Sequence, residues 1–88
     1  MTPPKPLGHM ARALQEADAA GKRGEVPIGA VIVGPDGALL AADGNRTREL
    51  SDPTAHAEIL VIRTAGAALG SERLIGCDLY VTLEPCPM

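Results

Sequence analysis

Three side chains in this sequence have the chemistry of a metal centre with a proton carrier beside it. His56 and Glu58 lie two residues apart in TAHAEIL, and Cys86 follows His56 by 30 positions in LEPCPM. Imidazole and thiolate are ligands that zinc prefers, and a catalytic zinc site combines three protein ligands with a water molecule. A carboxylate beside such a water can carry its proton. We therefore predict that His56 and Cys86 are metal ligands and that Glu58 is the general acid/base.

The predicted site residues His56 and Glu58 lie near the start of a predicted helix. Asp52 followed by Pro53 is typical of a helix N-cap and first helical position, which predicts a helix over 54–69. Residues two apart on a helix do not face each other, so His56 and Glu58 share a site only if it lies off the helix end. The helix is apolar on nearly all sides, and we expect most of it to be buried.

The rest of the chain predicts a small sheet. VPIGAVIV (26–33) and ALLAADG (38–44) flank the turn sequence GPDG, which indicates a β-hairpin. CDLYVTL (77–83) is a third strand. Because a crossover helix precedes this third strand, we expect it to lie parallel to the first strand.

An amphipathic helix is predicted over 9–20, and the proline-rich residues 1–8 before it form a flexible arm. The element order is therefore α-β-β-α-β, in one small three-layer α/β domain. Tyr80 is the only aromatic residue, so the core consists of aliphatic side chains and we expect low stability.

Composition excludes several classes of protein. The net charge of -3 argues against a protein that coats nucleic acid by electrostatics alone. The N-terminus has no apolar core of a signal peptide, and no run reaches the roughly 20 apolar residues of a membrane span. Two cysteines without a secretory signal indicate reduced thiols. We expect a cytoplasmic protein with no membrane partner.

The motifs GEVPIGAVIV, GNR at 44–46, DPTAHAEIL and RLIGCDLYVTLEPCPM resemble those of the bacterial tRNA-specific adenosine deaminases, within the cytidine deaminase superfamily. The resemblance runs from about residue 9 to the end. It implies that 9–88 are the N-terminal part of a zinc-dependent deaminase domain with a cytidine-deaminase-like fold, truncated before its remaining strands and helices.

The resemblance also implies a role for each site residue. His56 and Cys86 match two ligands of one Zn²⁺ per subunit, and Glu58 matches the general acid/base. Asn45 matches a contact to the substrate nucleoside, and Ala57 matches a small residue whose backbone lies against the base. The implied reaction is attack on C6 of adenine, which converts the wobble adenosine of a tRNA anticodon loop to inosine.

In this family a further cysteine ligand follows the position of Met88. We therefore expect the chain as written to lack its third ligand, to bind well under one zinc ion and to show little turnover. The resemblance implies a homodimer for the complete protein, with the tRNA anticodon loop as partner.

Other functions stay open. Within the superfamily the alternative is a different nucleoside or nucleobase deaminase. Riboflavin-pathway deaminases are typified by a PCxHxG motif, and this chain has Met88 at the position of its histidine. Deoxycytidylate deaminases tend toward HAExNA, and this chain has Leu60 and Val61 at the positions of its Asn and Ala. Outside catalysis the alternative is an inactive fragment or a structural partner that pairs through an exposed strand edge. A plain RNA-binding module is disfavoured by the acidic charge and by the absence of an aromatic platform.

Several polar residues have less specific predictions. Cys77 is expected to pack in the core, and His9 to be a polar helix residue without a partner. Arg46 and Arg48 either contact phosphates or are solvated loop charges.

Overall fold

The computed structural model describes residues 6–71 and 73–82, and the side chains from Gly8 onward within them. The elements follow the predicted order and have these bounds: α1 Pro6–Lys22, β1 Gly29–Val33, β2 Leu39–Gly44, α2 Ala57–Leu69 and β3 Asp78–Val81.

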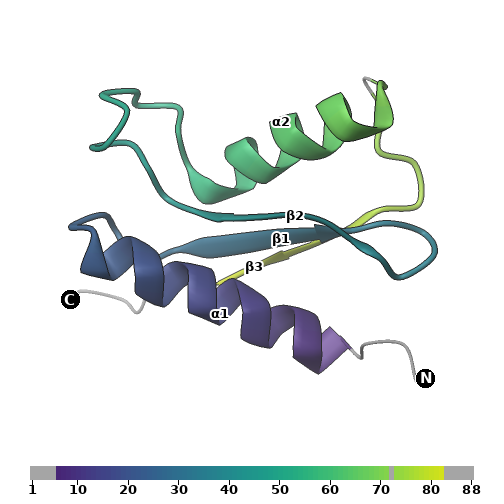
Figure 1. Ribbon diagram of the computed structural model, residues 1–88, viewed down its shortest axis with the longest axis horizontal. Helices are drawn as coiled ribbons and strands as arrows, with labels where there is room; N and C mark the ends of the chain where they lie inside the picture. Colours follow the sequence, from purple (N-terminus) through teal and green to yellow (C-terminus); the bar gives the residue numbers. More distant parts are fainter. Residues whose placement is uncertain (1–5, 72, 83–88) are drawn as a thin grey trace.

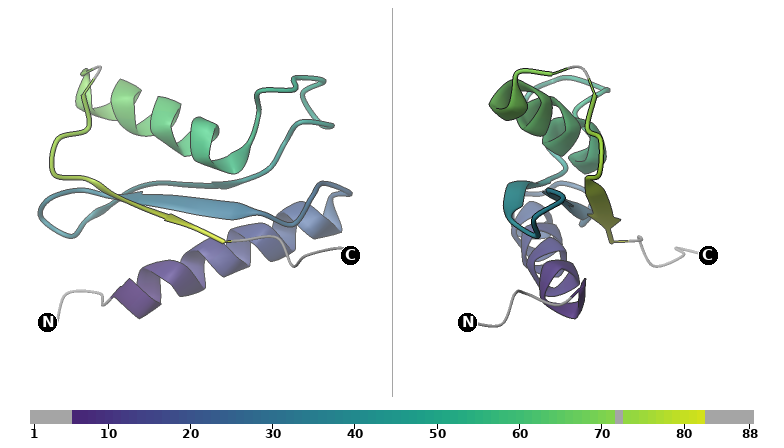
Figure 2. Two further views of the ribbon diagram at one scale, coloured as in Figure 1. Left: turned by 180° about the vertical axis from the view of Figure 1, so that it is seen from behind. Right: turned by 90° about the vertical axis from the view of Figure 1, so that its right-hand side faces the viewer.

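The two helices cover opposite faces of one sheet. Figure 1 shows α2 above the strands and α1 below them, and the end-on view in Figure 2 shows the sheet edge between the two helices. The predicted three-layer α/β architecture is confirmed.

The strand order is β2-β1-β3, and both outer strands run antiparallel to β1. The prediction that the third strand lies parallel to the first was therefore wrong. The crossover helix α2 joins β2 to β3, so those two strands share a direction. Because β1 is the hairpin partner of β2 and lies between them, it runs opposite to both.

The predicted hairpin is confirmed. Gly29 pairs with Gly44 in the register of β1 and β2. The turn is closed by the Gly34 N–H, which donates to the Ala38 carbonyl oxygen at 2.8 Å, and Gly37 has a φ of 85° there. The first strand begins at Gly29 instead of residue 26, because Pro27 has no N–H for strand pairing.

Two apolar clusters form the core, one on each side of the sheet. Residues of β1 alternate between them, since Ala30 and Ile32 face α2 while Val31 and Val33 face α1. The buried residues are mostly Ala and Val, as the lack of large aromatic residues predicts. Cys77 packs against the cluster under α2, which confirms its predicted packing role.

Two paired glycines allow α1 to lie directly on the sheet. A Cβ atom on Gly29 would be 2.1 Å from the Ala13 carbonyl oxygen, and one on Gly44 would be 2.6 Å from that of Glu16. No side chain fits in this space, so glycine is required where the helix backbone crosses the hairpin.

Helix boundaries differ from the predictions at the N-terminal ends. The flexible arm predicted over 1–8 is wrong for residues 6–8, which form the start of α1, and residues 1–5 lie outside the described residues. Asp52 does not cap α2. Its Oδ1 instead accepts the Thr54 N–H at 2.8 Å and the Thr54 hydroxyl at 2.7 Å, which makes a local turn.

Helix α2 is less buried than predicted. Val61 and Ala65 face the core, but Ile62 is 43% exposed and Leu69 is 47% exposed. The prediction that most of this helix is buried was wrong, because only one of its apolar faces meets the sheet. Gly70, in the left-handed conformation, ends the helix where the sequence places its end.

The histidine of α1 is also buried. The His9 ring lies 5.4 Å from the ring of Tyr80 on β3, so the expectation of a polar helix residue without a partner was wrong. None of the helices in the described ranges has both the length and the apolar character needed to cross a membrane.

Candidate functional site

Three of the predicted site residues lie at the N-terminal end of α2. His56 is the N-cap residue with extended backbone angles, Ala57 is the first helical residue, and Glu58 lies in the first turn. His56 is thus outside the helix instead of within it. The rule that residues two apart on a helix face different directions does not apply to it, which removes the geometric objection to a shared site.

Asn45 reaches this helix end from the end of β2. Its Oδ1 accepts the Ala57 N–H at 2.8 Å, and the side chain is only 2% exposed. One of the four unpaired N–H groups of the helix end is satisfied in this way by a residue twelve positions away. The structure therefore joins Asn45, Ala57 and the N-cap histidine in one place.

The backbone of Asn45 is held as firmly as its side chain. Its N–H donates to the Ile28 carbonyl oxygen at 3.0 Å, and its own carbonyl accepts Arg23 Nη2 at 3.2 Å. The next residue, Arg46, donates its N–H to the Ala55 carbonyl oxygen at 3.0 Å. The loop from β2 to α2 thus returns on itself immediately before His56.

His56 fits the role of a metal ligand. Its side chain is exposed and makes no capping hydrogen bond to the helix end. An imidazole that is not required by the helix end keeps its nitrogen lone pair for a metal ion. Cys86 lies outside the described residues, and the part of the chain that is described contains no set of three metal-ligating side chains.

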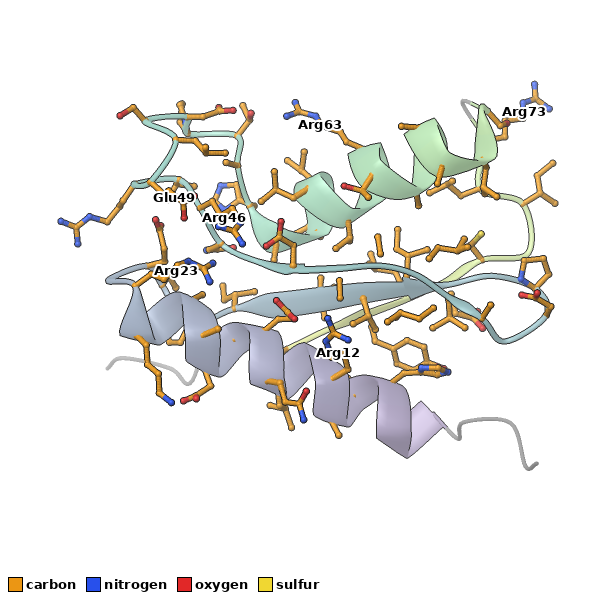
Figure 3. All side chains as sticks on the ribbon, in the orientation of Figure 1. Arg12, Arg23, Arg46, Glu49, Arg63 and Arg73 are labelled. Atoms are coloured by element: carbon orange, nitrogen blue, oxygen red, sulfur yellow. The ribbon has the colours of Figure 1, made fainter. Side chains whose placement is uncertain are left out.

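Arg46 is engaged in ion pairs on the surface of this loop. Its guanidinium donates to Asp43 at 2.8 Å and to Glu49 at 2.8 Å, and the hydrogen bond to Asp43 is the main reason that its pKa is raised above the ordinary value. Figure 3 shows Arg23, Arg46 and Glu49 gathered beside the loop, whereas Arg63 and Arg73 extend away from it. Arg48 donates to the Gly24 carbonyl oxygen at 3.0 Å. Both loop arginines therefore have protein partners.

Two residues at this end of the sheet escaped the sequence analysis. Thr82 accepts the Gly29 N–H through its hydroxyl at 2.9 Å and returns its own N–H to the Gly29 carbonyl oxygen, which ties the end of β3 to β1. Glu25 accepts N–H groups of the β2–α2 loop. A charged residue just after a helix gives no local signal of such a distant partner.

Comparisons with known proteins find a matching family and several similar proteins. The family model described as "Cytidine and deoxycytidylate deaminase zinc-binding region" matches residues 5–88. The chain is 68% identical over 79 residues to the tRNA-specific adenosine deaminase of Agrobacterium fabrum, which covers 90% of this chain and 51% of that protein. The chain spans about half the length of the curated tRNA-specific adenosine deaminases that it matches.

Two solved structures share the fold. One, from biochemical and structural studies of A-to-I editing by tRNA:A34 deaminases at the wobble position of transfer RNA, has a TM-score of 0.85 and 65% identity, over 92% of this chain and 58% of that chain. The other, guanine deaminase from Bacillus subtilis, has a TM-score of 0.86 and 41% identity, over 96% and 54%. Because the family model covers nearly the whole sequence, the chain belongs to the cytidine and deoxycytidylate deaminase family, in its zinc-binding region.

Proposed function

We propose that this chain is part of a zinc-dependent hydrolase that converts adenosine to inosine at the wobble position of tRNA. The observation that carries the proposal is the closure of the β2–α2 loop by the Asn45–Ala57 hydrogen bond, which brings Asn45 to the helix end that bears His56 and Glu58. The identity to tRNA-specific adenosine deaminases supports this choice of substrate.

The proposed roles follow from the residue chemistry. His56 and Cys86 hold the zinc ion, which when bound supplies an activated water for attack on C6 of adenine. Glu58 carries a proton to the ring and then to the departing ammonia. Glu58 is the acidic residue in the first turn of α2, next to the helix end that bears His56.

Asn45 is proposed to bind the nucleoside through its amide nitrogen. Its oxygen is already occupied by the Ala57 N–H, and its Nδ2 makes no hydrogen bond to any described residue. The amide nitrogen can therefore donate a hydrogen bond to an oxygen or nitrogen of the substrate. The contact of Ala57 with the base stays a prediction, and since its N–H is bonded to Asn45, that contact is through van der Waals packing.

The substitution Glu58→Ala tests the reaction. In the full-length protein that contains this chain, we expect inosine formation on an anticodon stem-loop to fall by about 10²- to 10⁴-fold, the usual contribution of a general acid/base, with zinc content unchanged. Inosine is measured by nucleoside analysis of the digested RNA, and zinc by elemental analysis. Loss of zinc together with activity would make Glu58 a ligand and would overturn its proposed role.

A second candidate is deamination of a free purine base, which is favoured by the fold similarity to guanine deaminase. The two functions are distinguished by the substrate on which the protein acts. Inosine production from the stem-loop without ammonia release from free guanine supports the tRNA enzyme, and the opposite result supports the alternative.

We also propose that the protein acts as a homodimer in the cytoplasm, the compartment in which a bacterial tRNA is modified. The exposed apolar side chains Ile62 and Leu69 on α2 support an association that covers this face. A monomer mass by light scattering of the zinc-loaded protein at micromolar concentration would contradict the dimer.

A further inference from the structure

One carboxylate from the connection between α1 and β1 holds the loop that carries Asn45. Glu25 is 6% exposed, and its Oε2 accepts the Glu49 N–H at 2.7 Å. Its Oε1 accepts the Arg48 N–H at 3.0 Å and the Thr47 hydroxyl at 3.4 Å. Three consecutive loop residues therefore converge on one side chain more than twenty positions earlier in the sequence.

The charge of Glu25 is stabilised by these contacts. Burial alone raises the pKa of its carboxyl group, but the N–H groups of Arg48 and Glu49, the Thr47 hydroxyl and the nearby charge of Arg23 together hold the pKa below its ordinary value. Glu25 is thus an anion at neutral pH, and hydrogen bonds to a charged acceptor are stronger than those between neutral groups.

Arginines add further links between the same two segments. Arg23 donates to the Asn45 carbonyl oxygen at 3.2 Å and lies 3.4 Å from the Glu49 carboxylate. Arg48 donates back to the Gly24 carbonyl oxygen at 3.0 Å. Figure 3 shows Arg23 and Glu49 facing each other across the gap between α1 and the loop. The segment 23–25 and the loop 45–49 form one connected unit.

This unit contains Asn45 of the candidate site, and other residues of it line a surface pocket. Asn45 begins the loop and bonds to Ala57, so a shift of the loop moves the side chain proposed to bind the nucleoside. A surface pocket of about 440 Å³ lies beside it, lined by Arg23, Gly24, Glu25, Arg48 and Glu49. The Glu25 carboxylate, which lines this pocket, accepts hydrogen bonds from the backbone of the loop that begins at Asn45.

We propose that Glu25 is a positioning residue that fixes the loop 45–49, and through it Asn45, for binding of the substrate. This inference rests on the proposed function. Glu25 does not touch the reacting atoms, and it acts only by holding the backbone that presents Asn45.

The substitution Glu25→Gln tests the inference in the zinc-loaded, full-length protein that contains this chain. Glutamine has the same size but only one acceptor oxygen, so one of the two backbone N–H groups loses its partner. We expect KM for an anticodon stem-loop to rise about tenfold, in keeping with the loss of one charge-assisted hydrogen bond. We expect kcat to change by less than about threefold, because the proton carrier is untouched.

Three controls make the result specific. Zinc content must equal that of the wild type. Asp18→Asn removes a carboxylate that is 67% exposed on α1 and paired only with Lys22, and it should leave KM unchanged. Glu25→Asp keeps the charge on a shorter side chain, and its KM should lie between those of the wild type and Glu25→Gln, which also guards against a single variant that fails to fold.

Amide hydrogen exchange gives a readout that does not depend on catalysis. In Glu25→Gln the Arg48 and Glu49 N–H groups should exchange faster, while the N–H groups within α2 stay protected. If Glu25→Gln has the KM and the amide exchange rates of the wild type, the inference is overturned. A parallel loss of kcat and zinc in this variant would also overturn it. If the full-length wild-type protein that contains this chain forms no inosine, the proposed function fails, and the exchange result alone then decides whether Glu25 holds the loop.

Discussion

The carboxamide of Asn45 has an acceptor end and a donor end, and described residues occupy only the acceptor. Its Oδ1 satisfies the Ala57 N–H, which would otherwise be an unpaired buried donor. The amide nitrogen makes no hydrogen bond to a described residue. The same residue therefore contributes to stability with one atom and, in the proposed function, to substrate binding with the other.

Two substitutions separate these roles. Asn45→Ala should lower the free energy of unfolding by about 1–3 kcal/mol, because the Ala57 N–H loses its acceptor. Asn45→Asp keeps an acceptor oxygen at the helix N-terminus and should be the more stable of the two, yet it removes the donor and should lose inosine formation. Urea denaturation and the stem-loop assay measure the two effects. Equal stability of Asn45→Ala and the wild type would show that the hydrogen bond does not hold the loop.

At the scale of elements, the position of α1 depends on the glycine pair in the hairpin. The helix backbone lies so close to β1 that the space next to Gly29 is filled by the Ala13 carbonyl oxygen. This contact also matters for the site, because the hairpin strands continue into Asn45 on one side and pair with Thr82 on the other.

We therefore expect Gly29→Ala to destabilise the protein by about 1–3 kcal/mol or more, the usual effect of overpacking a filled core. The matched control is Gly8→Ala on α1, where a Cβ would meet nothing within 4 Å. There the same substitution should leave stability unchanged or raise it by up to about 1 kcal/mol, because alanine favours helix over glycine. Thermal unfolding of both variants measures these two changes in stability. A Gly29→Ala variant as stable as the wild type would disprove the close contact between α1 and the hairpin.

For the molecule as a whole, two carboxylates whose pKa is lowered by hydrogen bonds, Glu25 and Asp52, make stability depend on pH in acid. Glu25 has its pKa lowered from 4.5 by its loop contacts, in spite of the opposing effect of burial. Asp52 has its pKa lowered from 3.8, first by the Thr54 hydroxyl and then by the Thr54 N–H. The unfolded chain binds more protons than the folded one in this range, so stability rises with pH there.

We expect the Tm to be nearly constant above about pH 5 and to fall as the pH drops below 4.5. In Glu25→Gln the fall should be shallower, because one carboxylate with a lowered pKa is gone. The Tm difference between wild type and variant should thus be largest near neutral pH and shrink in acid. Thermal melts from pH 7 to pH 3 measure it, and a difference that grows in acid would contradict the assignment of charge to Glu25.

Much of the secondary structure was predictable because it depends on local signals. The GPDG turn predicts the hairpin, and Gly70 predicts the end of α2. The start of α2 was not predictable, because Asp52 has the same capping preference for a helix as for the turn it forms with Thr54. The direction of β3 depends on which strand precedes the crossover helix α2. That strand is β2, so β3 runs parallel to β2 and antiparallel to β1.

By itself the sequence determined the chemical types at the site and the order of the elements that bear them, since the stretches that contain His56, Glu58 and Cys86 resemble the motifs of a known family. Only the tertiary structure decided that Asn45 meets the Ala57 N–H and that Glu25 holds the loop between them. These contacts join residues 12 and 24 positions apart, and they form because β1 and β2 pair and α1 packs on them. No periodicity along the chain encodes such a contact, because it depends on how separate elements pack and not on the preference of any one segment.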